Sequence, residues 1–437
     1  MSTRDVAELP PAPDSASGFQ YSSSQTVNFA EDSRSYVAAA PRHGNSGYNY
    51  NQVNLIQIPI TAGQSYLDCL STHLLMDVTL TAGTGVTKGL SLTDIGVMGL
   101  FRSMTLRVQG GAEVIRMDYI NIIMAWLALF YTPEWIHSTG RRYGYGTKMQ
   151  RVGDAQRTRR MELDMSVFAL FSQAHHLPLS AVGLELTFEL DNPVNALHVD
   201  VAGTSLPTYQ LDNVVLYQET ISGSEMIDSI VVGALANNEP VMLPMHLYKY
   251  QPVVLAANEV NVSKSIPFYG GQVTGVSCYY QKQVSYAAIT DDVFGLSVNP
   301  GLDNLQIQVG SEYIPPQRIN VLSQAGGRGA AEQLALIENF AYRQTSALSA
   351  RYQGDHFISS PPVAGAAVKY SRFFWSIPMG SGRDAVRGGG LNTANPPVNT
   401  VIMHNLSAAV TDALSMNVIF SLKGTFQVDL TGARLIT

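Results

Sequence analysis

The chain has 437 residues, of which 46% are hydrophobic and 14% charged, and its formal net charge is −7 at pH 7. That length allows two or three domains with separate cores, while the negative charge disfavours nucleic-acid binding over the whole surface, because such binding depends on Lys and Arg. Typical proteins carry about 25% charged residues. So few charges indicate a surface rich in uncharged polar residues or one largely buried against partners, and both favour assembly over a solitary enzyme.

The number of cysteines and the first residues of the chain indicate the cellular compartment in which the protein folds. Cys69 and Cys278 are the only cysteines, and neither belongs to a metal-ligand spacing. We therefore expect buried free thiols, without a disulfide framework or zinc site. The first residues, MSTRDVAELPPAP, lack an apolar signal core, and no run of about 18 apolar residues follows. These features predict a reducing, non-secretory compartment.

Residues 1–50 are predicted to form a disordered or extended N-terminal arm. They are rich in Ser, Pro, Ala and Asn, include the tract PPAPDSASGFQYSSSQ, and hold few large aliphatic residues. Such a segment cannot bury enough apolar surface to fold alone. Its charges are mainly Asp and Glu, which leaves either a plain disordered terminus or a segment that orders on a neighbouring subunit.

From residue 51 the sequence is typical of β structure. Short runs such as VNLIQIPI, HLLMDVTLTAG and MTLRVQG alternate with clusters of Gly, Pro, Asn and Asp. We assign residues 51–221 to a first β domain and 241–437 to a second. Helical periodicity is confined to segments near residues 118–130, 222–238 and 329–348.

The segment 222–240 is predicted to be a helix that links the two domains. Ser222 followed by Glu225 matches a capping box, and Asn237, Asn238 and Pro240 supply a stop.

Three pairs of segments repeat in the same order in the two β domains. LRVQGGAEVIR corresponds to IQVGSEYIPPQR, LELTFEL (184–190) to MNVIFSL (416–422), and TYQLD (208–212) to TFQVD (425–429). Ordered repetition separates a duplicated domain from chance matches. We therefore predict an all-β chain of two tandem jelly-roll sandwiches, with a few short helices in loops and the linker helix.

Two strand details are also predicted. In LELTFEL, Leu and Phe alternate with Glu and Thr, so one face packs on the core and the other meets solvent or a partner. Tyr209 and Leu211 are in step with each other while Val214 and Leu216 are not, which predicts a β-bulge near Asp212–Asn213.

Catalytic signatures are weak. The sequence has no GxSxG, Walker A, HExxH or Rossmann fingerprint. His175 and His176 are interpreted as a loop pair and not as metal ligands. Glu185, Glu189 and Asp191 favour a solvated strand face over a carbohydrate-cleaving pair, and the glycine runs at 326–329 and 387–390 favour loops over an anion cradle. We predict no catalytic residue, metal or cofactor.

A basic stretch at 141–160, RRYGYGTKMQRVGDAQRTRR, is the one prominent charge feature. Its interleaved Gly and Tyr indicate an exposed loop, which is solvated, contacts an acidic neighbouring subunit, or faces nucleic acid or an anionic membrane. The candidate residues are Arg141, Arg142, Lys148, Arg151, Arg157, Arg159 and Arg160.

Taken together, the chain resembles the double jelly-roll major capsid proteins of tailless icosahedral DNA viruses, the lineage that joins adenovirus-like, polinton-like and related phage capsids. The resemblance covers about residues 50–437 and rests on the tandem β blocks, the joining helix after TYQLDNVVLYQETISGSEMI, the element IQVGSEYIPPQRI, and the leading arm. It is one of layout more than of sequence.

The resemblance implies a structural, non-enzymatic protein that forms pseudo-hexagonal homotrimers tiling an icosahedral shell. It also implies location in the virion capsid after synthesis and assembly inside the host cell, without secretion. Implied partners are other trimers, penton and minor capsid proteins, with weak contact to packaged nucleic acid or an internal membrane.

Two alternatives stay open at this point: a duplicated β-sandwich that binds or cleaves carbohydrate, and a minor vertex or spike protein of a virion. Trp135 and Trp375 are candidate interface anchors, although core positions are favoured for both.

Overall fold

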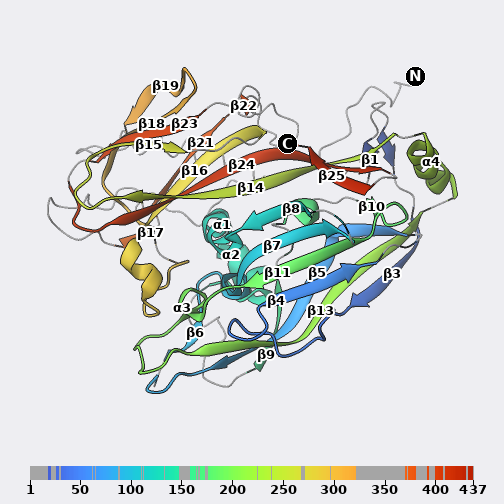
Figure 1. The fold of residues 1–437 in the computed structure, drawn as a ribbon, viewed down its shortest axis with the longest axis horizontal. Helices are drawn as coiled ribbons and strands as arrows, with labels where there is room; N and C mark the ends of the chain where they lie inside the picture. Colours follow the sequence, from blue (N-terminus) through green and yellow to red (C-terminus); the bar gives the residue numbers. More distant parts are fainter. Residues whose placement is uncertain are drawn as a thin grey trace.

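The computed structural model describes residues 18–20, 26–28, 31–61, 63, 65–86, 89–109, 111, 113–131, 133–146, 158–163, 165, 168–172, 176–223, 225–237, 239–266, 271–295, 297–320, 370–371, 373–379, 391–392, 399–406, 409–429 and 432–436. Most of them lie in antiparallel strands that form two β units, one lying above the other in Figure 1.

The first unit has two main sheets. One has the order β10-β5-β13-β3, with β9 also paired to β5, and the other has the order β4-β11-β7-β8. A short pair, β6 with β12, lies apart. The bounds are β3 Glu31–Ala39, β4 Leu55–Ile60, β5 Tyr66–Thr81, β6 Ser91–Leu92, β7 Phe101–Val108, β8 Glu113–Asp118, β9 Thr158–Leu163, β10 His176–Pro178, β11 Leu184–Leu190, β12 Leu197–His198 and β13 Thr208–Gly223.

The second unit also has two sheets. The larger runs β2-β1-β14-β24-β16-β17-β20, with β21 and β22 paired to β16 and β25 to β24; the smaller runs β15-β23-β18-β19. The bounds are β1 Gly18–Gln20, β2 Thr26–Asn28, β14 Val241–Leu255, β15 Asn261–Ile266, β16 Gln272–Lys282, β17 Ser297–Val298, β18 Leu302–Val309, β19 Glu312–Asn320, β20 Tyr370–Ser371, β21 Phe374–Pro378, β22 Leu391–Asn392, β23 Thr400–Leu406, β24 Leu414–Asp429 and β25 Gly432–Ile436.

Helices are short. The α-helices are α1 Ile120–Leu127, α2 Pro133–His137, α3 Pro193–Ala196 and α4 Glu225–Ala236, and the 3-10 segments are Gly96–Leu100, Ala128–Phe130, Thr139–Arg142, Ala169–Ser172 and Gln283–Ala287. The predicted helix near 118–130 is confirmed as α1 with its 3-10 extension. A helix also lies between β13 and β14, but Ser222 belongs to β13, so its predicted capping role is wrong. The segment 329–348 lies outside the described residues.

The two units repeat one topology, which confirms the predicted duplication. Strands β3, β4, β5, β7, β8, β11 and β13 take the same sheet positions, in chain order, as β14, β15, β16, β18, β19, β23 and β24. The paired segments LRVQGGAEVIR and IQVGSEYIPPQR span the equivalent hairpins β7-β8 and β18-β19.

Of the other two sequence pairings, that of LELTFEL is wrong and that of TYQLD is confirmed at the level of the strand but is out of register. The counterpart of LELTFEL, strand β11, is β23, and both strands alternate strictly between buried and half-buried residues; MNVIFSL instead lies inside β24. TYQLD and TFQVD do lie in the equivalent strands β13 and β24, but TYQLD begins β13 and TFQVD ends β24. Because apolar and polar residues alternate in many strands, the sequence comparison aligned segments that do not occupy equivalent positions in the two units.

The N-terminal segment predicted to be an arm contributes strands to both units. Strand β3 pairs with β13 from Ala39↔Leu216 to Glu31↔Gly223, and β1 pairs with β14 at Gln20↔Met242. The predicted start of the first unit, residue 51, therefore falls after a strand that belongs to its sheet.

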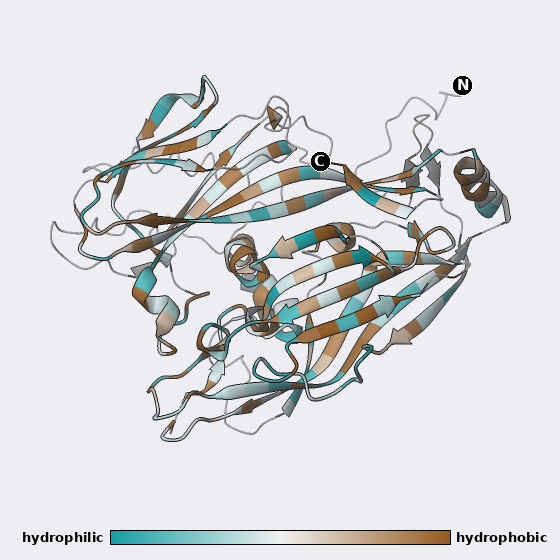
Figure 2. Ribbon diagram, in the orientation of Figure 1, coloured by the Kyte–Doolittle hydropathy of each residue, from teal (hydrophilic) through white to brown (hydrophobic). Residues whose placement is uncertain are grey.

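Strand alternation builds the core. Hydrophobic and hydrophilic residues alternate along β4, β7 and β11 in Figure 2, and Leu184, Leu186, Phe188 and Leu190 are buried. The predicted bulge is confirmed, because the register of β13 against β5 shifts between Asp212 and Val215 and Asn213 has φ 49°. The extra residue returns Val214 and Leu216 to the buried face.

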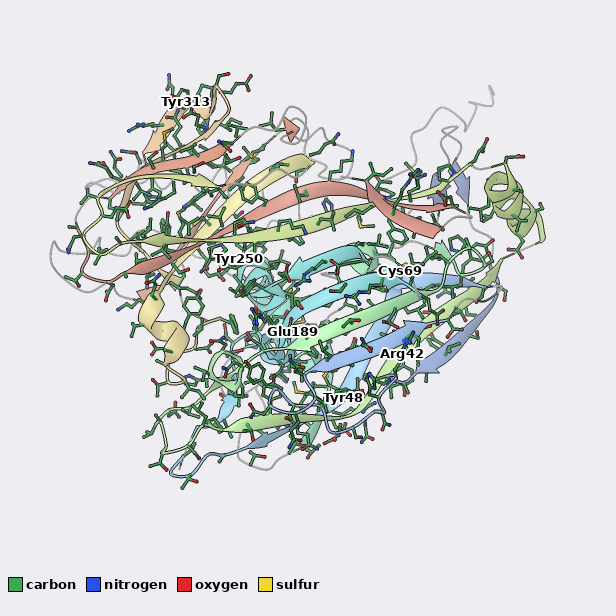
Figure 3. All side chains as sticks on the ribbon, viewed as in Figure 1. Arg42, Tyr48, Cys69, Glu189, Tyr250 and Tyr313 are labelled. Carbon is green, nitrogen blue, oxygen red and sulfur yellow. The ribbon has the colours of Figure 1, made fainter. Side chains whose placement is uncertain are left out.

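Aromatic side chains join the two units. Trp126 on α1 meets Tyr248 on β14 edge to face, with ring centroids 5.7 Å apart, and Tyr119 meets Tyr250 at 5.1 Å. Figure 3 shows Tyr250 where β14 passes α1. The Tyr279 hydroxyl donates to the Ile122 carbonyl at 3.2 Å. Because Trp126, Tyr248 and Tyr279 are buried in one continuous hydrophobic cluster, the two units share a core.

A buried polar chain crosses the core of the second unit. Trp375 Nε1 donates to the Tyr280 hydroxyl at 3.0 Å, and that hydroxyl lies 3.2 Å from His404 Nε2. The core position expected for Trp375 is confirmed, since its side chain is fully buried. Burial, assisted by the positive charge of Lys264, lowers the pKa of His404 from 6.5 to about 3.

We predict that His404 makes the protein sensitive to acid. Below pH 6.5 the unfolded chain protonates this histidine while the native protein holds it neutral, so the free energy of unfolding falls as the pH drops towards 3. Protonation of His404 should lower the free energy of unfolding by about 1.4 kcal/mol for each pH unit in this range. Denaturant unfolding between pH 7 and pH 4 should show a shallower loss for His404→Phe than for the wild type. Equal slopes would contradict the prediction.

Candidate functional site

The described part of the basic stretch is anchored to the first unit. Arg142 donates from Nη2 to the buried carboxylate of Glu162 on β9. Arg160 donates from Nη1 to Asn213 O at 2.7 Å and lies 3.2 Å from Asp77 Oδ1. Arg141 and Arg159 are exposed, and neither forms an ion pair with another described residue. Lys148, Arg151 and Arg157 lie outside the described residues.

An aromatic cluster holds this stretch in place. Trp135 stacks on Tyr131 with ring centroids 4.1 Å apart and on Tyr143 at 5.9 Å. The Val97 amide donates to the Tyr143 carbonyl at 2.9 Å, and Gly96, at φ +61°, lies so close to Tyr143 that a Cβ would overlap its carbonyl oxygen. Trp135 is half-buried and packs against the core. Residues 139–146 are therefore a packed corner and not an open loop.

The three candidate carboxylates do not form a catalytic pair. Glu185 pairs with Arg42 at 2.5 Å, and Glu189 accepts from Ser103 Oγ at 2.9 Å with Arg102 at 3.8 Å; Figure 3 shows Arg42 and Glu189. The Glu189 contacts are cross-strand pairs between β11 and β7, whereas Arg42 lies in the turn after β3. They leave both glutamates in structural roles.

Asp191 has a separate role inside the unit. It is buried, and it accepts hydrogen bonds from Asn121 Nδ2 at 2.5 Å and from the Asn192 amide at 2.7 Å. Burial raises its pKa, and the hydrogen bonds oppose that rise. Asp191 thus ties the start of α1 to the end of β11, and the carbohydrate-cleaving alternative gains no support from this group.

The remaining candidates are structural or lie outside the described residues. Cys69 and Cys278 are buried free thiols, as predicted, and burial raises the pKa of each. His176 begins β10, so its predicted loop position is wrong. Within the described ranges no three His, Cys, Asp or Glu side chains gather as a metal site. His175 and the glycine runs at 326–329 and 387–390 are not among the described residues.

A search of the described helices finds none that is both long and apolar enough to cross a membrane.

One surface was not indicated by the sequence patterns: the outer edge of β3 and the cavity beside it. A signal was present in β13, where the inward-facing series Leu216, Gln218, Thr220 turns from apolar to polar. Inward polar residues mark places where a sandwich opens or binds something.

No protein-family model and no curated protein matches the sequence, but solved structures match nearly its whole length. VP54 of PBCV-1, fitted into a reconstruction of the virophage Sputnik, has a TM-score of 0.59 at 12% identity, covering 94% of this chain and 99% of that one. The fold is that of viral major capsid proteins. The Faustovirus major capsid protein has a TM-score of 0.57 at 9% identity, and the match covers 93% of this chain and 92% of that one. The Sputnik virophage structure has a TM-score of 0.54 at 12% identity, and the match covers 100% of this chain and 92% of that one.

These matches fit the repeated topology of the two units, so the predicted double jelly-roll fold is confirmed. At such low identities the likeness concerns the backbone and not individual side chains.

Arg159 and Arg160 provide a test of the basic surface. Arg160→Ser should lower the free energy of unfolding by about 1 kcal/mol, because it removes a half-exposed ion pair and a hydrogen bond at the β13 bulge. Arg159→Ser should leave it unchanged, because Arg159 is exposed and forms no such contact with the residues that the structure describes. Chemical denaturation of both variants is the measurement, and an equal loss from both would refute this assignment.

Proposed function

We propose that this chain is the major capsid protein of an icosahedral virus and that it forms pseudo-hexagonal homotrimers that tile the shell. The single observation that carries the proposal is the match of nearly the whole chain, both units included, to VP54 of PBCV-1. A partial match to one β-sandwich would fit many functions, because sandwiches recur in unrelated proteins.

The duplication supplies the physical reason for a trimer. Three copies of a chain with two similar units place six similar units around a threefold axis, which approximates a hexagon. Hexagons tile flat facets, and closed rotational symmetry gives each copy the same contacts. Because obligate interfaces are large and apolar, the low charged content of 14% suits a chain that is covered on several sides.

The proposal has no catalytic step. The chain acts by closing into trimers and then making weaker, repeated contacts between trimers, with penton and minor capsid proteins as further partners. Its place is the virion capsid after synthesis and assembly inside the host cell. Contact of the basic stretch with a neighbouring subunit, packaged nucleic acid or an internal membrane belongs to the same proposal.

The mass of the purified protein tests the trimer. Light scattering or native mass spectrometry at micromolar concentration should give a mass near three times the 47.3 kDa of one chain. The trimer should persist on dilution, because obligate interfaces release their subunits slowly. A monodisperse monomer would contradict the proposal.

A minor vertex or spike protein of a virion is the remaining alternative. Quantifying the chain in purified particles separates the two. A facet protein should dominate the particle's protein mass, whereas a vertex protein would be present in few copies.

A further inference from the structure

Strand β3 forms an open edge of the first unit. On one side β3 pairs with β13 along most of its length. On the other side no described strand pairs with β3. It lies at the margin of the molecule in Figure 1. An edge strand presents unpaired N–H and C=O groups that can accept another strand.

The equivalent edge of the second unit is covered at one end. There β14 takes the sheet position of β3, and β1 pairs with its outer side at Gln20↔Met242, close to where β14 begins. The described part of the chain thus adds a strand at one end of this edge in the second unit and adds none along β3 in the first.

The other long edge strands carry residues that discourage pairing. Proteins protect exposed edges with proline, charged side chains or short strands. Strand β19 contains Pro315 and Pro316, β15 contains Lys264, and β4 contains Pro59. In β3 the charged residues Glu31, Asp32 and Arg34 lie in the first half of the strand, and the second half, residues 35–39, reads Ser-Tyr-Val-Ala-Ala, without charge or proline. Tyr36 is 69% exposed and Val37 46%, so this second half of the edge is both unprotected and largely apolar.

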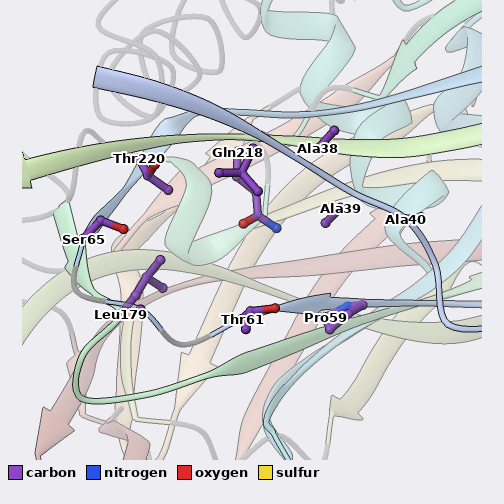
Figure 4. A pocket seen from close by; sticks show the side chains of 11 residues that line it. Ala38, Ala39, Ala40, Pro59, Thr61, Ser65, Leu179, Gln218 and Thr220 are labelled. Carbon is purple, nitrogen blue, oxygen red and sulfur yellow. The ribbon is translucent and has the colours of Figure 1, made fainter. Parts of the chain in front are cut away.

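A cavity of about 420 Å³ adjoins this edge. It lies between β13 and β3 on one side and Pro59, Thr61, Gly63, Ser65 and Leu179 on the other. Figure 4 shows the Gln218 side chain pointing from β13 into this space.

Gln218 brings an unused donor to the cavity. Its side chain is 3% exposed, and its Nε2 has no hydrogen-bond partner among the described residues. The next inward-facing pair on the same two strands, Thr220 and Ser35, is satisfied internally, with its hydroxyls 2.8 Å apart. A buried donor without an acceptor costs free energy, and an incoming acceptor removes that cost.

We propose that the free edge of β3 is a docking site for an extended strand from a second copy of this chain. Its backbone pairs with β3, and one of its inward-facing side chains, a Gln or Glu, brings an oxygen to Gln218 Nε2. This inference rests on the proposed function, since a shell supplies copies of the same chain at every contact.

The geometry allows both contacts at once. Val37 is the direct partner of Gln218 across β13 and β3, so the incoming residue beside Val37 lies two strand spacings, about 10 Å, from Gln218. Two long side chains that lean over the short Val37 can span that distance. The uncharged residues 35–39 also bring no like-charge repulsion between copies.

Hydrogen–deuterium exchange tests the pairing without altering the protein. Amides of residues 31–39 should exchange at least about tenfold more slowly in assembled shells than in dispersed trimers. Shells whose β3 amides exchange at the trimer rate would overturn this inference and leave the proposed function intact. A chain that forms nothing larger than a monomer would overturn both.

A charged edge provides the second test. The double variant Tyr36→Lys with Val37→Lys should keep the Tm of the trimer, because both side chains are exposed, and raise the concentration needed for assembly at least about tenfold. Val232→Lys, which changes a valine on α4 that is 57% exposed, is the control and should assemble normally. Wild-type assembly by the double variant would refute the docking site.

Gln218→Leu separates docking from a packing defect. Removing the unpaired amide should raise the Tm of the unassembled protein by about 2–4 °C, and it should weaken assembly because the incoming oxygen loses its donor. A higher Tm with unchanged assembly would show that Gln218 plays no part in docking.

Discussion

The aromatic contact between the two units is the constraint on which the rest of the molecule depends. A duplicated jelly roll on a flexible linker could present its units at any angle, and three such chains could not form a regular hexagon. The buried rings of Trp126 and Tyr248, together with the contact of Tyr119 with Tyr250, fix that angle across the junction. Helix α1 belongs to the first unit in sequence but packs in the core that both units share.

Much of the fold could be predicted from the sequence, because the signals involved are local. The glycine-containing turns of β7-β8 and β18-β19 identify equivalent hairpins, and the broken alternation after Asp212 identifies a bulge. The out-of-register matches failed for a physical reason. Apolar residues recur at every second position in MNVIFSL as they do in LELTFEL, although this part of β24 is buried on both faces. The alternation alone therefore does not separate β24 from the true counterpart of LELTFEL, β23.

The candidate surfaces were less accessible to sequence reasoning because their partners are distant along the chain. The basic stretch could be recognised from its amino-acid composition. The ion pair of Arg160 with Asp77 could not, because it forms only where β9 lies beside β5. The role of β3 depends on pairing with β13, and the polar, Ser-rich sequence before residue 50 suggested an arm instead. Tertiary pairing outweighed composition there, since a strand needs few apolar residues when its neighbour supplies the core.

The pairing of β3 with β13 also has a consequence for synthesis. Arg34 and Glu219, which form an ion pair between these strands, are 185 residues apart, so at about 5–20 residues per second the earlier strand waits roughly 10–40 s for its partner to be made. During that interval the growing chain exposes β5 and β3 without the strand that lies between them. The nascent first half is therefore prone to aggregation until β13 has been made, and rapid translation of the intervening residues or a ribosome-bound chaperone would limit that exposure.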